Sequence, residues 1–136
     1  MKSIESKGNR PLSLPRSDIL RGKRNFQRLF KEGSSLSEQH VSLRYVILSD
    51  ASENNLIGFI TGRRIGKAHE RNYVRRRLRE AYRLDQHILA DYYKAGTPVF
   101  HVAFIAKTKQ VDFATLQEEC VRLLKRFKTK LNHHSV

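Results

Sequence analysis

The sequence predicts a small α+β domain with one mixed sheet of about four strands and helices packed mainly on one face. Three observations lead to this fold class. The chain has 136 residues, which suits a single domain. Its strand-like runs are the alternating segment 41–48 and the apolar segments 56–61 and 99–106. Segments with the apolar spacing of helices precede, separate and follow these runs, which gives the order α-β-β-β-α-β-α once a short strand at 34–37 is included.

The first elements follow from caps and alternation. Residues 1–17 show no apolar period and carry four basic residues, so they predict a flexible basic arm, either an RNA-contacting tail or an end without function. Asn25 as N-cap, apolar Phe26, Leu29 and Phe30, and a closing Gly33 predict a short helix. In the strand 41–48, the side chains expected on one face are Val41, Leu43, Tyr45 and Ile47.

The second half of the chain is predicted as helix, strand, helix. Residues 68 to about 90 have helical period, and the nearly continuous apolar run 99–106 suits a strand covered on both faces. Asp112 is expected to cap a last helix, whose apolar stripe contains Phe113, Leu116, Cys120, Leu123, Leu124 and Phe127. Cys120 within that stripe indicates packing rather than catalysis. The domain is therefore expected over 18–130, with a frayed C-terminus at 131–136.

Composition restricts the class of protein. Lys and Arg total 27 and Asp and Glu total 13, a net charge of +14 that favours a polyanionic partner. A single cysteine excludes a disulfide framework and a Cys-based zinc site. No apolar run has the length of a membrane helix or a signal peptide, so we expect a soluble cytoplasmic protein.

The charge is concentrated between residues 63 and 83. This window holds nine basic residues, eight of them arginine, and two glutamates, a net charge of +7. Guanidinium groups can fork two donors onto phosphate oxygens, which favours a nucleic acid. On a helical wheel, Val74, Leu78 and Ala81 form one face, and the opposite arc carries Asn72, Arg75, Arg76, Arg79 and Arg83. Like charges at i, i+4 destabilise a helix, so this stripe predicts a polyanion bound there.

The residues alone leave three classes of protein open: an RNA-binding protein, a ribosomal or assembly protein, and an anionic-membrane binder. The sequence lacks helix-turn-helix spacing, heptads and zinc ligands, which favours RNA over DNA. A ribosomal or assembly protein that binds rRNA would carry the same features. An anionic-membrane binder would need bulky apolar residues free for lipid, whereas Val74, Leu78 and Ala81 are needed for packing.

The run 63–80, RRIGKAHERNYVRRRLRE, resembles the signature of the bacterial ribonuclease P protein component. The segment 25–33 resembles the first helix of that family, and the resemblance extends over about 18–130. It implies a ribosomal protein S5 domain 2-like fold with a left-handed βαβ crossover, although general handedness rules favour a right-handed one. One position departs from the Arg-Asn-Arg element of the family, because Tyr73 stands at its third place.

The resemblance also implies a function. The protein would bind a catalytic RNA and the 5′ leader of precursor tRNA, and would promote Mg²⁺-dependent endonucleolytic removal of the leader. The implied RNA-binding residues are Arg63, Arg64, Lys67, Arg71, Asn72, Arg75, Arg76, Arg79 and Arg83. Phe26, Phe30 and Tyr45 would line the cleft for the leader, although core packing is the commoner role of such residues.

No autonomous active site is predicted. The six histidines are scattered along the chain, and no histidine pair lies near a carboxylate at ligand spacing on one element. We therefore expect no metal site and no cofactor on the protein itself. The resemblance implies that the RNA subunit carries the hydrolytic chemistry and holds the Mg²⁺.

Overall fold

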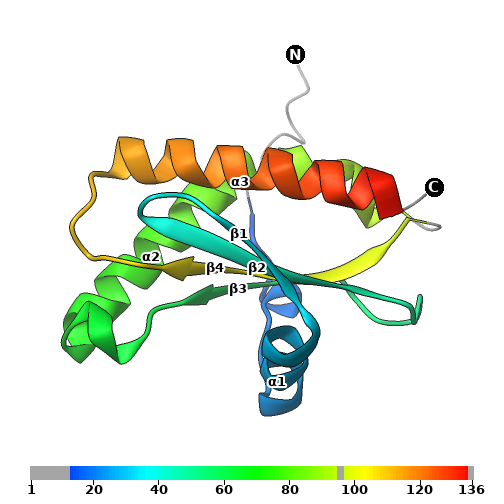
Figure 1. Ribbon diagram of the computed structural model, residues 1–136, viewed down its shortest axis with the longest axis horizontal. Coiled ribbons are helices and arrows are strands. Elements are labelled where there is room, and N and C mark those ends of the chain that lie inside the picture. Colours follow the sequence, from blue (N-terminus) through cyan, green and yellow to red (C-terminus); the bar gives the residue numbers. More distant parts are fainter. Residues whose placement is uncertain (1–12, 95–96, 135–136) are drawn as a thin grey trace.

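The structure is a computed structural model that describes residues 13–94 and 97–134. Its helices are α1 (Lys23–Glu32), α2 (Ala68–Asp85) and α3 (Phe113–His134), and its strands are β1 (Ser34–Ser37), β2 (Val41–Leu48), β3 (Leu56–Ile60) and β4 (Val99–Ala106) (Figure 1). The predicted order α-β-β-β-α-β-α is confirmed. Residues 1–12 of the predicted arm lie outside the described part of the chain.

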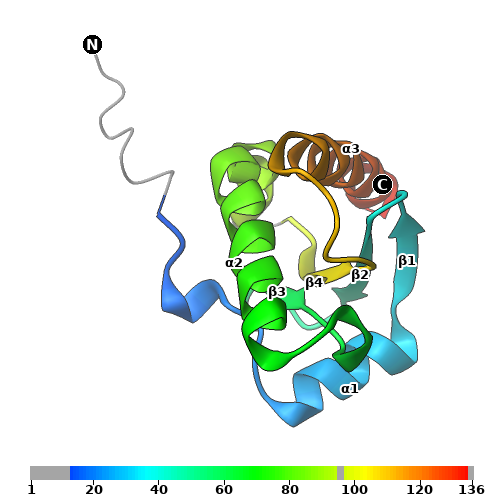
Figure 2. The same ribbon diagram turned by 90° about the vertical axis from the view of Figure 1, so that its left-hand side faces the viewer.

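The four strands form one mixed sheet in the order β1-β2-β4-β3. β2 is antiparallel to β1 and to β4, whereas β3 is parallel to β4. With β3 and β4 pointing at the viewer, the chain passes from β3 through α2 above the sheet and into β4 on the right (Figure 2). This path is a left-handed crossover, as the family resemblance implies.

Helices cover both faces of the sheet, but unequally. α2 and α3 lie over one face, and α1 lies under the other (Figures 1 and 2). The main core fills the α2/α3 side, where Val102 and Phe104 of β4 are fully buried. A smaller core of Leu20, Leu29, Val46 and Ala103 joins α1 to the opposite face. Strand β4 is therefore covered on both sides, as its continuous apolar run predicts.

The start of α1 differs from the prediction. The helix begins at Lys23 after Gly22, whose φ of 93° lies in the left-handed region that favours glycine. Asn25 lies within the first turn, where its Nδ2 donates to the Arg21 carbonyl at 3.0 Å. The end at Gly33 is confirmed. A Cβ there would meet the Leu29 carbonyl oxygen at 2.4 Å, so only glycine permits this approach of helix and strand.

The last helix is longer than predicted. Asp112 does cap its start, because its Oδ1 accepts a hydrogen bond from the Thr115 backbone N–H at 2.7 Å. The helix then continues to His134, and Leu131 is fully buried, so residues 131–134 belong to the domain. Before it, the region predicted as one helix over 68–90 is α2 followed by a 3₁₀ helix at Gln86–Tyr93.

Candidate nucleic-acid interface

The basic segment leaves the sheet through a tight turn. After β3, a 3₁₀ turn at Arg63–Ile65 leads to Gly66, whose φ is 150°. A Cβ at Gly66 would lie 2.3 Å from Oε1 of Glu70. That carboxylate accepts from the Lys67 backbone N–H at 2.8 Å and forms an ion pair with Lys109, whose hydrogen bond holds the pKa of Glu70 below its usual value. Glycine at this position therefore leaves room for the Glu70 carboxylate, which accepts a hydrogen bond from a backbone N–H at the start of α2.

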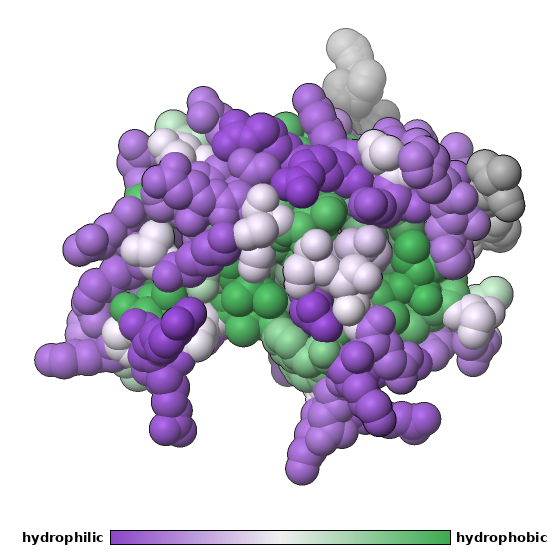
Figure 3. All heavy atoms as spheres, in the orientation of Figure 1, coloured by the Kyte–Doolittle hydropathy of each residue, from purple (hydrophilic) through white to green (hydrophobic). Residues whose placement is uncertain are grey.

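The predicted division of α2 into two faces is confirmed. Val74, Leu78 and Ala81 are buried against the sheet, together with Tyr82, which the wheel did not single out. On the other side Asn72, Arg76 and Arg79 are exposed, and Arg71, Arg75 and Arg83 are half-buried. Arg63, Arg64 and Lys67 extend this side into the preceding turn. Hydrophilic side chains project from this end of the molecule at the lower left of Figure 3.

Three of these arginines contact neutral oxygen atoms. Nη1 of Arg75 donates to Asn72 Oδ1 at 2.5 Å, and its Nη2 donates to Thr61 Oγ1 at 2.9 Å. Arg71 donates to the Gly66 carbonyl at 2.7 Å, and Arg79 lies 3.5 Å from the Leu14 carbonyl. These contacts orient the guanidinium groups but leave their charge uncompensated.

Arg83 is the exception on this face. It forms an ion pair with Glu80 at 2.7 Å, and that hydrogen bond lowers the pKa of the Glu80 carboxyl. Arg83 is consequently less available to a phosphate than the other predicted residues.

Four further cations make no side-chain hydrogen bond or ion pair within the described residues. They are Arg63, Arg64, Lys67 and Arg76, and all four are exposed. A run of exposed cations without carboxylate partners produces a strong local positive potential. We call these four residues together with Arg71, Asn72, Arg75 and Arg79 the arginine face.

The three aromatic residues predicted for a leader cleft do not share one face. Phe26 is half-buried against the smaller core, and the ring of Phe30 is 47% exposed on α1. Tyr45 lies on the opposite side of the sheet, where its ring centroid is 5.0 Å from that of Phe127 in α3. Alternation along β2 explains this, since Tyr45 shares its face with Val41 and Leu43. The structure thus places Phe26 and Phe30 on α1 and leaves Tyr45 partly buried against the main core on the other side of the sheet.

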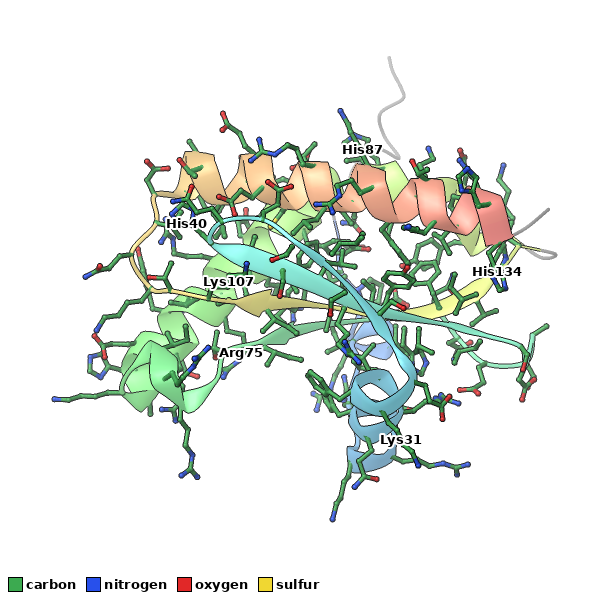
Figure 4. All side chains as sticks on the ribbon, viewed as in Figure 1. Lys31, His40, Arg75, His87, Lys107 and His134 are labelled. Carbon is green, nitrogen blue, oxygen red and sulfur yellow. The ribbon has the colours of Figure 1, made fainter. Side chains whose placement is uncertain are left out.

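Arg44 takes the place beside Phe30 that the sequence analysis gave to Tyr45. Its Nε and Nη2 donate to the carbonyls of Leu29 and Phe30 at 3.0 and 2.7 Å, which satisfies the end of α1. Its guanidinium carbon lies 5.8 Å from the Phe30 ring centroid. In the view of Figure 4, the labelled Lys31 of α1 and Arg75 of α2 both appear below the strands. The period-two pattern of β2 could have identified Arg44, since it predicts that residues 44 and 45 point to opposite faces.

Two histidines do approach carboxylates from distant elements. His40 Nδ1 lies 2.6 Å from Oε2 of buried Glu119, and the His40 backbone N–H donates to Oε1 at 2.8 Å. Burial raises the pKa of Glu119, but these hydrogen bonds outweigh it, so the pKa lies below its usual value. His101 is buried 4.0 Å from Glu53, and desolvation lowers its pKa. Over residues 13–94 and 97–134, no three His, Cys, Asp or Glu side chains gather as a metal site.

The fold and the arginine face together define a small α+β domain suited to binding a polyanion. Comparison with known proteins identifies its family. The family model described as Ribonuclease P matches residues 14–128. The ribonuclease P protein component of Chloroflexus aggregans is 33% identical over 110 residues, covering 81% of this chain and 77% of that protein. The one from Natranaerobius thermophilus is 31% identical over 114 residues, covering 82% and 93%.

Solved structures agree with this similarity. The ribonuclease P protein from Thermotoga maritima superposes with a TM-score of 0.63 at 29% identity, covering 79% of this chain and 96% of that one. The Staphylococcus aureus protein has the same fold, with a TM-score of 0.64 at 18% identity. The chain belongs to the ribonuclease P protein component family. Membership assigns it a general role in tRNA processing and an RNA partner. Among the described residues, no helix is both long and apolar enough to span a membrane.

Proposed function

We propose that this chain is the protein subunit of a bacterial ribonuclease P and grips the catalytic RNA with its arginine face. The observation that carries the proposal is the absence of carboxylate partners for that face within the described residues. A guanidinium held by neutral acceptors keeps its full charge for a phosphate, and its forked donors fit phosphate oxygens.

The 5′ leader of precursor tRNA would bind beside α1. Phe30 offers an exposed ring on which an unpaired base can stack, and Arg44 supplies a cation next to it. Phe26 supports this surface from the smaller core. Tyr45 is not part of this proposal, because its ring lies on the other side of the sheet.

The hydrolytic step is assigned to the RNA and its bound Mg²⁺. The described residues of the protein offer no cluster of metal ligands. The closest His–carboxylate contact, His40 with Glu119, uses both Glu119 oxygens to tie the β1–β2 turn to α3. In this proposal the protein contributes binding and positioning, and cleavage takes place as part of the ribonucleoprotein.

Reconstitution tests this function. The protein is added to a bacterial ribonuclease P RNA at low Mg²⁺, and cleavage of a 5′-leader-bearing precursor tRNA is measured. We expect the wild-type protein and the Arg122→Ala control to restore cleavage, because Arg122 lies on α3 and is paired with Glu38. Binding of the RNA without restored cleavage would instead favour an rRNA-binding or assembly protein. Binding to anionic vesicles with no affinity for RNA would favour the membrane alternative.

A further inference from the structure

Tyr73 occupies a position on α2 that the arginine face does not explain. Its side chain is 53% exposed, which is unusual for a large aromatic residue on a charged helix. The guanidinium carbon of Arg77 lies 5.3 Å from the Tyr73 ring centroid and 5.9 Å from that of Phe113. The ring therefore belongs to a group formed by α2 and the start of α3.

This group is held in place before any ligand arrives. Arg77 Nη1 donates to the Val111 carbonyl at 2.8 Å, so its guanidinium is fixed between the two rings. Phe113 is half-buried and packs against the main core. Cation–π contacts of this kind orient the Tyr73 ring while leaving much of its surface exposed.

Two adjoining hollows meet at Tyr73 and Arg76. One has a volume of about 370 Å³ and is lined by Tyr73, Arg76, Arg77, Glu80 and Phe113. The other has a volume of about 550 Å³ and is lined by His69, Glu70, Tyr73, Arg76, Lys109 and Gln110. Both hollows are open to solvent at the surface, so part of an extended RNA chain can reach them.

The charges around these hollows favour an anionic ligand. The two acidic residues that line them are already engaged, since Glu70 pairs with Lys109 and Glu80 pairs with Arg83. Arg76 makes no ion pair in the described part of the chain and is exposed at the point where the hollows meet. An exposed ring next to an uncompensated cation can bind an unpaired nucleotide, because the base stacks on the ring and a phosphate pairs with the cation.

We propose that Tyr73 and Arg76 form a binding site for one unpaired nucleotide of the RNA partner, with its base stacked on Tyr73 and its phosphate on Arg76. The proposal rests on the proposed function, because it assigns one contact of the same RNA. At the third position of the Arg-Asn-Arg element, the tyrosine thus supplies a ring for stacking in place of a guanidinium group.

Substitution of Tyr73 tests the site through salt dependence. Affinity for ribonuclease P RNA is measured over a series of salt concentrations. Tyr73→Leu is expected to weaken binding roughly 5- to 150-fold at every concentration without changing the slope of log affinity against log salt, because stacking releases no counterions. Tyr73→Phe is expected to bind like wild type. Tyr93→Leu is the matched control, because Tyr93 is 46% exposed and lies outside the arginine face.

A tryptophan reporter gives an independent readout. The chain contains no tryptophan, so Tyr73→Trp and Tyr93→Trp each carry a single one. We expect ribonuclease P RNA to quench the fluorescence of Tyr73→Trp and to leave that of Tyr93→Trp unchanged.

The outcomes separate the two proposals. Wild-type-like binding by Tyr73→Leu, or an unquenched Tyr73→Trp, would overturn the stacking site while wild-type cleavage still supported the proposed function. A reduced salt slope for Tyr73→Leu would also overturn it, because the ring would then act by positioning Arg77. Failure of the wild-type protein to bind the RNA would overturn both.

Discussion

The partner of each guanidinium distinguishes the arginines at the scale of single residues. Arg75 and Arg71 donate to hydroxyl, amide or carbonyl oxygens, whereas Arg83 donates to a carboxylate. A neutral acceptor fixes the direction of a cation without cancelling its charge, so Arg75 is both positioned and available. An arginine already paired with a carboxylate has to exchange that partner before it can bind a phosphate.

Replacing Arg79 or Arg75 with alanine is expected to weaken RNA binding. Each variant loses one phosphate contact, so the salt slope should become shallower by about 0.7–0.9. Arg79→Ala should leave the melting temperature unchanged, because its one side-chain hydrogen bond among the described residues, to the Leu14 carbonyl, is long. Arg75→Ala should cost about 1 kcal/mol, since two partly exposed hydrogen bonds are lost. Binding titrations and thermal melts check this. A loss of stability that accounts for all of the lost binding would show that these residues are structural.

Phe30 and Tyr45 are expected to behave differently from each other. Phe30→Ala removes an exposed ring, so it should lower affinity for leader-bearing precursor tRNA more than for mature tRNA. Tyr45→Ala removes a ring packed on Phe127, so it should destabilise the fold by about 2–4 kcal/mol and affect both RNAs alike. To distinguish the two roles, the affinity of the holoenzyme for each of the two RNAs and the melting temperature of each protein variant are measured. Equal effects of Phe30→Ala on both RNAs would assign Phe30 to the core.

At the scale of elements, local patterns predicted most of the fold. Alternation in 41–48 and the apolar run 99–106 located β2 and β4 at the observed residues, because those patterns depend only on which faces are covered. The two faces of α2 were predicted for the same reason. The start of α1 at Lys23 was not predicted, because Asn25 is a favourable N-cap residue and was expected to cap the helix in place of Gly22.

Two sequence-based predictions that proved wrong or incomplete depend on contacts between elements far apart in the sequence. Tyr45 was placed beside Phe30 although it shares the β2 face of Val41 and Leu43, because the sequence did not show which side of the sheet α1 covers. The contact of His40 with Glu119 joins residues 79 positions apart, so no local spacing could reveal it. The buried end of α3 at Leu131 was also missed, although local spacing indicates it, because Leu131 follows Phe127 by four residues and continues the apolar stripe.

The His40–Glu119 contact predicts how stability depends on pH. Because the pKa of Glu119 is lowered in the folded state, its contribution is complete above the ordinary value of 4.5 and is lost as the pH falls through the folded pKa. Glu119→Gln should lower the free energy of unfolding by about 1–3 kcal/mol at pH 7, because the amide cannot accept hydrogen bonds from His40 at both positions. The difference from wild type should shrink below pH 4.5 in urea unfolding. A difference that stays constant down to pH 3 would contradict this.

At the scale of the whole molecule, the net charge of +14 is unevenly compensated. On α3, Arg122 and Arg126 both pair with Glu38, and Lys128 lies 3.9 Å from Asp91. On the arginine face, no carboxylate partner occurs among the described residues. The arginine face is therefore a dense cluster of uncompensated cations around the start of α2, which favours binding of a polyanion there.

The salt dependence of binding to ribonuclease P RNA tests this account most directly. If the arginine face neutralises four or more phosphates, log affinity should fall against log salt with a slope of about −3 or steeper. Joint replacement of Arg76 and Arg79 with glutamine should make the slope shallower by about 1.5, whereas Arg122→Gln should leave it unchanged. A slope near zero, or one that responds equally to both replacements, would contradict the claim that one face of α2 binds the RNA.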